Sequence, residues 1–510
     1  MGESLKARAV RGFQWTTMSA LATSLLQIGY TSIMSRLLNP QDFGLIAIAQ
    51  IIFSFVAYFA RMGMGQALIQ KDTLDEVEIR AVFTSSMILG IFTTLVIWLL
   101  APYVTLVFNK VDPSVVGVTR GMSISFLVAG LSITSGSLLA RQLRFKLLAA
   151  QEMSTYLVAY LGIGVTMGLL GYGVWSLVAA QVSQSVFAAI FNYAFTRHSL
   201  APVFAWRYHR PFFSYGSKIS LTSFVEFIGG VLSPFLIGRF FGDYLLGIYR
   251  QAHMILDLPI YKITYSIQSV TFPVFSLIQS EKERLTKAYV SAMVLMSAVL
   301  LPICFSVAVA AEEVILVMFG EKFREAIPIL RILSIGMGFK YLTTFPGLVC
   351  DATARLSGKM VVQSSYVVLL AIAAYIFRDY GLMGFAYIVT FGETVRNFAY
   401  LVVTGRILNL NFKSHLSIYL PSLMVGLVNA LAVYLITIPL HFYTIPKLPS
   451  LILQMATGII VLSATLFIWP SHHMKGIIVN QVFSIPVIRN KFGFLLTRTR
   501  WYAGYKINQA

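Results

Sequence analysis

The stretch RLLNPQDFG, residues 36–44, is a short polar interruption between two long apolar segments. No charged residue occurs over residues 12–35 before it or over residues 43–60 after it. A helix of about 20 mostly apolar residues is long enough to cross a lipid bilayer. Asn, Pro and Asp are typical of turns and of helix starts. The stretch therefore predicts the tight turn of a membrane-spanning helical hairpin.

The composition of the whole chain indicates the same environment. Of the 510 residues, 57% are hydrophobic and only 12% are charged, whereas soluble domains carry about 25% charged residues. Charge-free runs long enough to cross a bilayer recur along the chain. They are apolar throughout, and so they do not alternate as the strands of a membrane barrel do. We therefore predict an all-α polytopic membrane protein.

The formal net charge of +19 would suggest a nucleic-acid partner in a soluble protein. Here the excess Lys and Arg residues are interpreted as orientation signals in loops and as a basic tail that contacts anionic lipid headgroups. No nucleic-acid partner is expected. The two cysteines, Cys304 and Cys350, lie in apolar runs and suggest no disulfide, metal site or cofactor.

We predict fourteen transmembrane helices. The spans are residues 12–35, 43–66, 81–108, 117–140, 153–170, 172–196, 213–238, 244–274, 288–310, 326–350, 360–377, 381–404, 416–438 and 449–469. Lys and Arg concentrate in alternate loops and in the C-terminal tail. By the positive-inside rule these loops, together with both termini, are cytoplasmic.

The opening motif has a second copy in the chain, RFFGDYLLGIYRQA at residues 239–252. At one constant offset, Arg36 aligns with Arg239, Gly44 with Gly247, and Ala49 with Ala252. Six predicted spans separate the copies, and an even number gives parallel repeats, which in transporters flank a substrate path. The alternative is that hairpin turns of this size share such residues by chance.

The repeat predicts the domain organisation. It comprises an N-terminal six-helix lobe over 1–196, a cytoplasmic linker over 197–212, a second six-helix lobe over 213–405, helices 13 and 14 over 406–470, and a basic interfacial tail over 471–510.

The sequence resembles the Wzx-type polysaccharide flippases of the multidrug/oligosaccharidyl-lipid/polysaccharide exporter superfamily, in particular the colanic-acid-exporter-like branch. The motifs are VRGFQW at 10–15, SRLLNPQDFGLIAIA at 35–49, MGMGQALIQK at 62–71, RQLRFK at 141–146, GYGVWSLV at 171–178, GIYRQAHMILDLP at 247–259 and TFPVFS at 271–276. The likeness covers residues 5–470. It implies a V-shaped, MATE-like arrangement of the two lobes.

The resemblance also implies a function. Such proteins move undecaprenyl-diphosphate-linked oligosaccharide units from the cytoplasmic to the periplasmic leaflet of a bacterial inner membrane by alternating access. The units are used for exopolysaccharide, capsule or O-antigen synthesis. The partners implied are the lipid-linked oligosaccharide and the bilayer, with the polymerase and chain-length machinery of the same pathway as candidates.

Ionisable residues inside spans are costly and are functional candidates. A diphosphate would attract cationic side chains, so Lys262, Lys340 and Arg396 are the candidate headgroup ligands. Arg61 is a fourth candidate, although snorkelling to the interface explains it equally well. Glu393 precedes Arg396 by three residues on one helical face, and the two side chains could instead form a structural pair.

Two acidic residues are candidates for ion coupling. Glu226 lies on a thin polar stripe of an apolar span, where a carboxylate could load and release a proton; alternatively, it pairs with Lys262 or Lys340. Asp257 is five residues from Lys262, a spacing that favours pairing less. In the first span, Gln27, Thr31 and Ser24 form a polar stripe suited either to sugar hydroxyls or to helix packing.

Two other function classes remain open. One is an antiporter of small organic cations from the same superfamily, which would favour acidic residues in the cavity. The other is a membrane polysaccharide polymerase or ligase, which would need a sizeable external loop with catalytic groups. The longest predicted external loop, about 311–325, is short and lacks His. No nucleotide-binding motif occurs in a loop. We therefore expect a transporter and not an enzyme.

Overall fold

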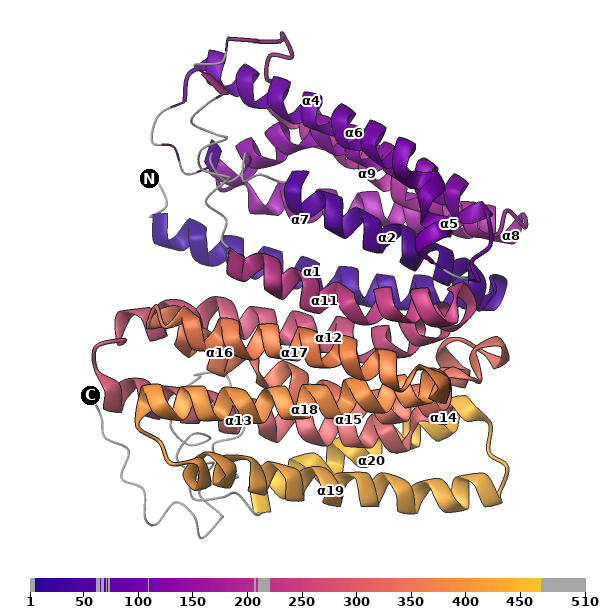
Figure 1. Cartoon of the computed structure of the whole chain (residues 1–510), viewed down its shortest axis with the longest axis vertical. Helices are drawn as coiled ribbons and strands as arrows, with labels where there is room; N and C mark the ends of the chain where they lie inside the picture. The colour runs from indigo at the N-terminus through magenta and orange to yellow at the C-terminus, as the bar shows by residue number, and fades with distance from the viewer. Residues whose placement is uncertain are drawn as a thin grey trace. The chain divides into compact units, whose positions relative to one another are not determined.

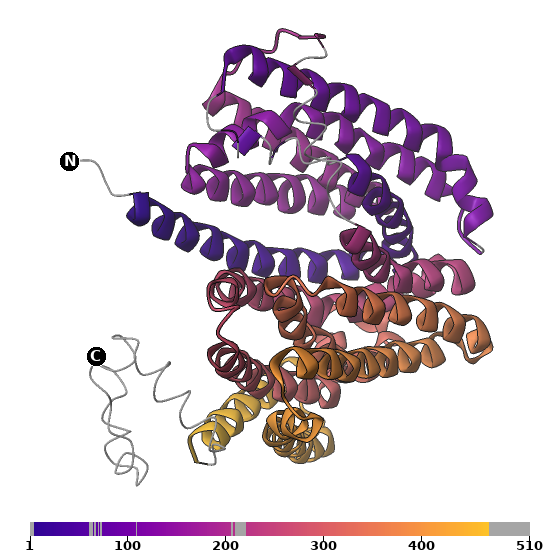
Figure 2. The ribbon, with the colours of Figure 1, turned by 60° about the vertical axis from the view of Figure 1, so that its left-hand side comes forward.

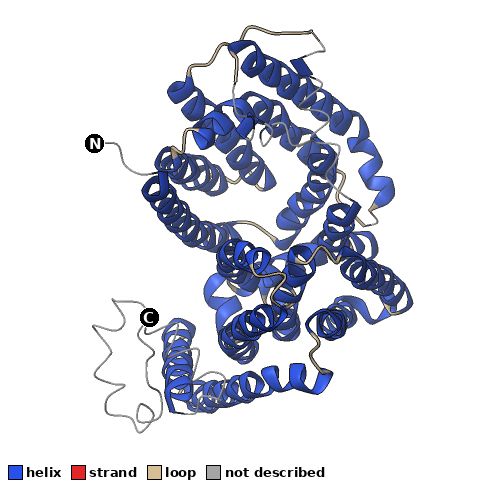
Figure 3. Cartoon of the chain, turned by 90° about the vertical axis from the view of Figure 1, so that its left-hand side faces the viewer, coloured by secondary structure: helices blue, strands red, loops and turns tan. Residues whose placement is uncertain are grey.

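The structure is a computed structural model. It describes residues 5–60, 65, 68–69, 71, 74–108, 110–205, 208–209 and 221–468. Every regular element among these residues is a helix (Figure 3). The prediction of an all-α chain is therefore confirmed, while Arg61 and the basic tail 471–510 lie outside the described residues.

The longer helices can be followed by label in Figure 1. They are α1 (Leu5–Leu37), α2 (Pro40–Ala60), α4 (Glu76–Leu100), α5 (Val104–Val107), α6 (Ser114–Arg141), α7 (Phe145–Tyr156), α8 (Val165–Leu169), α9 (Val174–Thr196), α11 (Leu221–Phe241), α12 (Asp243–Leu277), α13 (Lys282–Val309), α14 (Ala311–Met318), α15 (Ala326–Leu342), α16 (Thr344–Ala352), α17 (Leu356–Ile376), α18 (Gly381–Leu408), α19 (Phe412–Phe442) and α20 (Lys447–Ile468). The other helical segments are the short 3-10 helices η1 (Ala101–Tyr103), η3 (Glu321–Phe323) and η4 (Arg378–Tyr380) and the π-helix η2 (Leu157–Gly164).

Many of these helices suit a bilayer. Among the described residues, nine helical segments are long and apolar enough to cross a membrane, and Pro40–Val56 is a shorter apolar helix. Each predicted span overlaps a helix of the structure. A multi-pass membrane protein is therefore confirmed, whereas the count of fourteen crossings stays a prediction.

The contacts divide the chain into two compact units. Unit 1 comprises Met1–Ser266, Val314–Leu333 and Gln363–Gly392, and unit 2 comprises Ile267–Glu313, Ser334–Val362 and Glu393–Ala510. Each of α12, α15, α17 and α18 contributes residues to both units. The predicted lobes have other boundaries and stay a prediction.

In unit 1, α6 packs against both α4 and α9 (Figures 1 and 2). Two glycines bring α4 and α6 close together. A Cβ on Gly130 would lie 2.6 Å from the carbonyl oxygen of Ser86, and one on Gly90 would lie 2.8 Å from that of Phe126. Small residues at such crossings let backbones approach closely, which is how helices associate in lipid.

The opening motif forms the turn that its sequence predicts. Helix α1 ends at Leu37 and α2 begins at Pro40, where proline is compatible with the first helical position. The backbone N–H of Asn39 donates to Asp42 Oδ2 over 2.9 Å. The side chain of Asp42 thus closes the turn.

The second copy of the motif forms a turn of the same kind. Gly242 separates α11 from α12 with a φ of +88°, a conformation that favours glycine. Asp243 Oδ2 accepts hydrogen bonds from the backbone N–H of Asp112 at 3.0 Å and from Gln41 Nε2 at 3.2 Å. The buried Asp243 carboxylate at the start of α12 therefore links the turn between α11 and α12 to the start of α2 and to the loop between α5 and α6.

In unit 2, α19 packs against both α13 and α20. Buried polar contacts fix the first of these pairs: the hydroxyls of Ser297 and Ser422 are 2.8 Å apart, and Asn429 Nδ2 donates to Ser306 Oγ over 2.9 Å. At one end, His441 Nε2 lies 2.6 Å from Glu313 Oε1. Polar side chains that hydrogen-bond across helices in this way help hold a membrane bundle together.

Candidate functional site

The polar face of α12 in unit 1 carries three ionisable side chains. Arg250, His253 and Asp257 are spaced by three and four residues, which places them on one side of the helix. His253 Nε2 lies 3.8 Å from Asp257 Oδ1, and both side chains are about one-third exposed or less. Arg250 is also partly buried. This face is the centre of the candidate site.

The predicted polar stripe of α1 lies beside this face. Gln251 Nε2 donates to Ser35 Oγ over 3.2 Å, and the Thr31 hydroxyl is 4.0 Å from the sulfur of Met254. The hydroxyl groups of the stripe donate hydrogen bonds to the backbone of α1 itself. The Thr31 hydroxyl donates to the carbonyl oxygen of Gln27, and the Ser24 hydroxyl donates to that of Ala20. These bonds agree with the helix-packing interpretation of the stripe and leave the hydroxyl oxygens as acceptors.

A cluster of tyrosines adjoins Arg250. The rings of Tyr156 and Tyr160 stack with centroids 4.4 Å apart, and Tyr30 meets Tyr160 edge-on at 4.9 Å. Tyr160 belongs to η2, a π-helical segment, a rare geometry that is frequent at functional sites. Gly164 leaves room for this cluster, since a Cβ there would lie 2.9 Å from Tyr30 Oη.

Arg250 interacts electrostatically with Tyr160. Within the described ranges it forms no ion pair with a carboxylate. A guanidinium presents several donors in a planar fork that suits phosphate oxygens. The buried hydroxyls of Tyr30 and Tyr156 also have no hydrogen-bond partner in the described part of the chain. This group can therefore bind an anion that carries several acceptor oxygens.

Arg250, His253 and the tyrosine cluster were not predicted from the sequence. For the first two a signal was available, because both share a helical face with Asp257. The four-residue spacing of Tyr156 and Tyr160 was a local signal for that pair. No local pattern could have added Tyr30, since α1 meets η2 only in the folded chain.

The remaining candidates in unit 1 lie on two helices. Lys262 is partly buried on α12, two residues before a buried Thr264. Glu226 is on the exposed side of α11. Both take part in interactions with neighbouring groups. Their roles in binding and coupling stay predictions.

Unit 2 contains the other two predicted cations. Lys340 is on α15, with Nζ 5.1 Å from the ring centroid of Tyr341, and Arg396 is on α18. Asn397 Nδ2 donates to the carbonyl of Phe339 over 3.2 Å, so the two helices are adjacent at this level. The structural pair that the spacing allowed is present: an Arg396 guanidinium nitrogen lies 2.5 Å from Glu393 Oε2.

Among the described residues, no three or more His, Cys, Asp or Glu side chains form a cluster that could hold a metal ion. Cys304 and Cys350 are buried free thiols. Their surroundings are those of small core residues.

Solved structures with the same fold define the class of protein. The lipid II flippase MurJ in its inward closed conformation matches with a TM-score of 0.70 at 13% identity, over 88% of this chain and 98% of that chain. An inward-facing multidrug resistance MATE family transporter of the MOP superfamily matches with a TM-score of 0.57 at 16% identity, over 77% and 98%. The chain therefore has the MurJ- and MATE-like fold, as the sequence predicted.

The family follows from sequence comparison. The model of the polysaccharide biosynthesis protein family matches residues 33–328, more than half of the chain. The protein belongs to this family. The resemblance inferred from the motifs is thus confirmed at the level of the family.

Three relatives illustrate the family. The teichuronic acid biosynthesis protein TuaB of Bacillus subtilis is 25% identical over 65% of this chain and 68% of its own length. The succinoglycan biosynthesis transport protein ExoT of Rhizobium meliloti is 26% identical over 66% and 68%. The lipopolysaccharide biosynthesis protein WzxC of Escherichia coli is 22% identical over 65% and 67%. With these relatives and the solved neighbours, the chain stands among transporters and not among enzymes.

Proposed function

We propose that the protein is a flippase that carries lipid-linked oligosaccharide units across the membrane for polysaccharide synthesis. The observation that carries this proposal is the guanidinium of Arg250, which forms no ion pair with a carboxylate among the described residues and adjoins the cluster of Tyr30, Tyr156 and Tyr160. A cation in a span is costly unless it has a function. A diphosphate bound there would compensate it. The matched family and the relatives named for polysaccharide synthesis support the same substrate class.

In this proposal each group has a separate task. Arg250 binds the diphosphate of an undecaprenyl carrier. The tyrosine hydroxyls and the polar stripe of Gln27, Thr31 and Ser24 form hydrogen bonds with the sugars. Lys340 in unit 2 stays a separate candidate ligand for a diphosphate. Alternating access then moves the headgroup from one leaflet to the other.

The energy source belongs to the same proposal. Asp257 beside His253 forms a carboxylate–imidazole pair that could exchange a proton. Glu226 on α11 is the second candidate for coupling to a proton or another cation. Transport driven by the ion gradient would follow from either group.

The orientation follows from the loop charges. Both termini lie in the cytoplasm of a bacterium, the protein resides in the inner membrane, and the units move towards the periplasm. The polymerase and chain-length machinery of the same pathway receive the product there. The turn at 37–40 is then on the periplasmic side.

One observation bears on the organic-cation antiporter. The MATE-like fold is compatible with a cationic substrate. The carboxylate of Asp257, which lies beside His253, could also attract a cation. Arg250 opposes it, because a guanidinium repels an organic cation at the same site. We therefore favour the anionic, lipid-linked substrate.

Deleting the gene tests the function in the cell. We expect lipid-linked oligosaccharide units to accumulate in the cytoplasmic leaflet, where periplasmic glycan-modifying enzymes cannot reach them. Mass analysis of the extracted lipid would identify the sugar. A normal distribution of these units between leaflets in the deletion strain would contradict the proposal.

A further inference from the structure

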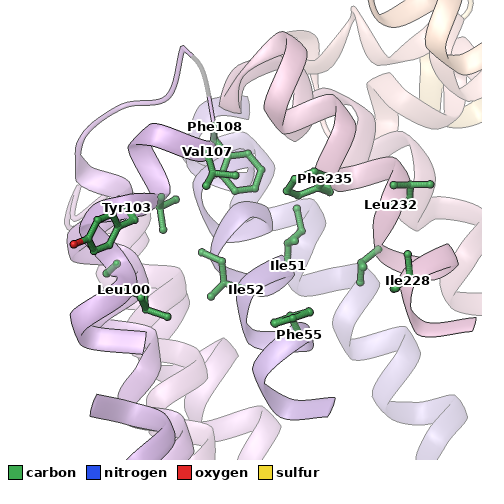
Figure 4. Close-up of a pocket in the computed structure, with 13 residues that line it drawn as sticks. Ile51, Ile52, Phe55, Leu100, Tyr103, Val107, Phe108, Ile228, Leu232 and Phe235 are labelled. Carbon is green, nitrogen blue, oxygen red and sulfur yellow. The ribbon is translucent and has the colours of Figure 1, made fainter. Parts of the chain in front are cut away.

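Unit 1 contains an apolar pocket of about 480 Å³ away from the Arg250 site (Figure 4). Its walls come from three parts of the chain: α2, the end of α4 with η1 and α5, and α11. The labelled side chains converge from these helices on a common space. Ile51 and Ile52 come from α2, and Ile228 and Leu232 come from α11.

The sequence creates this space by breaking a helix. Pro102 lies in the short 3-10 turn η1, which separates α4 from α5. Proline removes a backbone donor and disrupts a continuous helix. The residues around the break, Leu100 and Tyr103, are more than half exposed. The wall is therefore irregular here, and the pocket opens beside it.

Aromatic side chains close the pocket at its ends. The rings of Phe108 and Phe235 meet edge-on with centroids 5.5 Å apart. Phe108 approaches α11 at Gly238, where a Cβ would lie 3.0 Å from the ring. Phe55 and Phe227 contact at 6.4 Å near the other end. These rings limit the pocket along the direction of the helices.

The lining admits only a hydrocarbon. Every lining residue is aliphatic or aromatic, and Figure 4 shows the hydroxyl of Tyr103 directed away from the space. The lining residues belong to Glu76–Val107, Phe224–Phe241 and Pro40–Val56, the apolar helices suited to a bilayer, with Phe108 just beyond the first of them. Water is not stabilised in such a site, because the lining offers it no hydrogen-bond partners.

We propose that this pocket binds the isoprenoid chain of the lipid-linked substrate; this inference rests on the proposed function. The headgroup of such a substrate crosses through polar surroundings, whereas its chain stays in an apolar environment throughout. An apolar site on the protein would keep the chain close to the headgroup path. A volume of this size lies within the usual range of ligand pockets, about 300–1,000 Å³.

The pocket extends past the middle of the membrane. At 1.5 Å per residue, Phe235 lies about 9 Å from the end of α11, and Phe55 lies about 22 Å along α2 from the turn at 37–40. The hydrocarbon core of a bilayer is about 30 Å thick, so the pocket reaches from the half on the side of that turn across the midplane. The walls of the pocket include α2 and α4 from the predicted N-terminal lobe and α11 from the predicted second lobe. A bound isoprenoid chain therefore contacts helices of both predicted lobes.

A photolabelling experiment tests this inference. The full-length protein in liposomes is irradiated with a polyprenyl diphosphate that carries a diazirine in its terminal isoprene units, and the labelled peptides are identified by mass spectrometry. We expect labels within 100–108 and 228–235, and we expect unlabelled polyprenyl diphosphate to remove them. A phosphatidylethanolamine competitor should leave them in place.

Two variants make the test specific. Ile52→Trp fills the pocket and should lower labelling about tenfold, the change produced by losing a few buried methylene contacts. Ile91→Trp places the same indole on a 42% exposed position of α4 outside the pocket and should leave labelling unchanged. Equal labelling in both variants, or equal competition by phosphatidylethanolamine, would overturn the inference in favour of ordinary lipid contact.

The same liposomes separate this inference from the proposed function. Translocation of a lipid-linked oligosaccharide without pocket labelling would overturn the pocket and leave the flippase standing. Pocket labelling without translocation would contradict the flippase and retain a binding site for isoprenoid chains.

Discussion

Gly44 and Gly247 make reciprocal backbone contacts at the starts of α2 and α12. A Cβ on Gly44 would lie 1.8 Å from the carbonyl oxygen of Asp243, and one on Gly247 would lie 1.8 Å from that of Pro40. Gly247 is the repeat equivalent of Gly44, and Asp243 is that of Pro40. Such an exchange of equivalent contacts is what a two-fold relation between copies produces. The alternative of chance similarity between the two motifs explains it less well.

Alanine at either glycine should destabilise unit 1. The added methyl would overlap a carbonyl oxygen of the other helix, and backbone at a helix start cannot move away freely. Overpacking of this kind costs about 1–3 kcal/mol. We expect Gly44→Ala and Gly247→Ala to lower the thermal unfolding temperature of the detergent-purified protein by similar amounts.

Gly29→Ala on α1 is the matched control, because a Cβ there would meet nothing within 4 Å. It should leave the unfolding temperature unchanged or raise it slightly, since alanine favours a helix over glycine by about 1 kcal/mol. If the three variants unfolded alike, the close approach at Gly44 and Gly247 would not exist in solution.

Replacing Arg250 should impair transport without impairing folding. Hydrogen bonds to charged groups contribute about 1.5–3 kcal/mol, so Arg250→Gln should reduce translocation in liposomes about tenfold to a hundredfold. Arg250→Lys should retain part of the activity, because lysine keeps the charge but loses the fork of donors. Arg284→Gln is the control, as Arg284 forms an exposed pair with Glu281. Wild-type translocation by Arg250→Gln would remove this residue from the headgroup site.

Much of the fold could be predicted from the sequence because lipid imposes a strict rule. Backbone groups in a bilayer must be satisfied within helices, so long apolar runs identify helices, and polar stretches such as 36–44 identify turns. The close approach at Gly44 also has a sequence signal in the repeated motif. The domain boundaries had no equally strong signal, because helices such as α12 carry residues of both units.

The candidate site was less predictable because it depends on which helices meet. Single charges such as Lys262 and Glu226 were visible as exceptions in apolar spans. Arg250 lies within the motif GIYRQAHMILDLP at 247–259, whose family likeness gives no sign that this residue could bind a ligand. The contact of Tyr30 with Tyr160 joins α1 to the π-helical segment η2, and no apolar periodicity reveals that contact.

The pair formed by Glu393 and Arg396 allows its two possible roles to be separated. Their side chains are 8% and 12% exposed. Removing one partner of a buried pair costs about 3–5 kcal/mol, whereas replacing both is often neutral. We therefore expect Arg396→Gln to reduce the yield of folded protein and the double variant Glu393→Gln/Arg396→Gln to restore it.

Translocation by the double variant then decides the function of Arg396. Wild-type rates would show that the pair is structural. A folded double variant with translocation reduced about tenfold or more would retain Arg396 as a ligand for the diphosphate, since charged hydrogen bonds have this magnitude.

The segment that follows α9 should open as the pH falls. Burial lowers the pKa of His198, whose ring packs against Phe83 and Tyr193. The folded state therefore favours the neutral imidazole, while the unfolded segment takes up a proton near the ordinary pKa of about 6.5. The stabilisation is present above that pH and is lost as the pH falls towards the lowered value. Hydrogen exchange of residues 197–205, compared at equal pH with His198→Phe, should show faster opening only in the wild type below about pH 6.5. The same pH dependence in both proteins would assign the opening to another group.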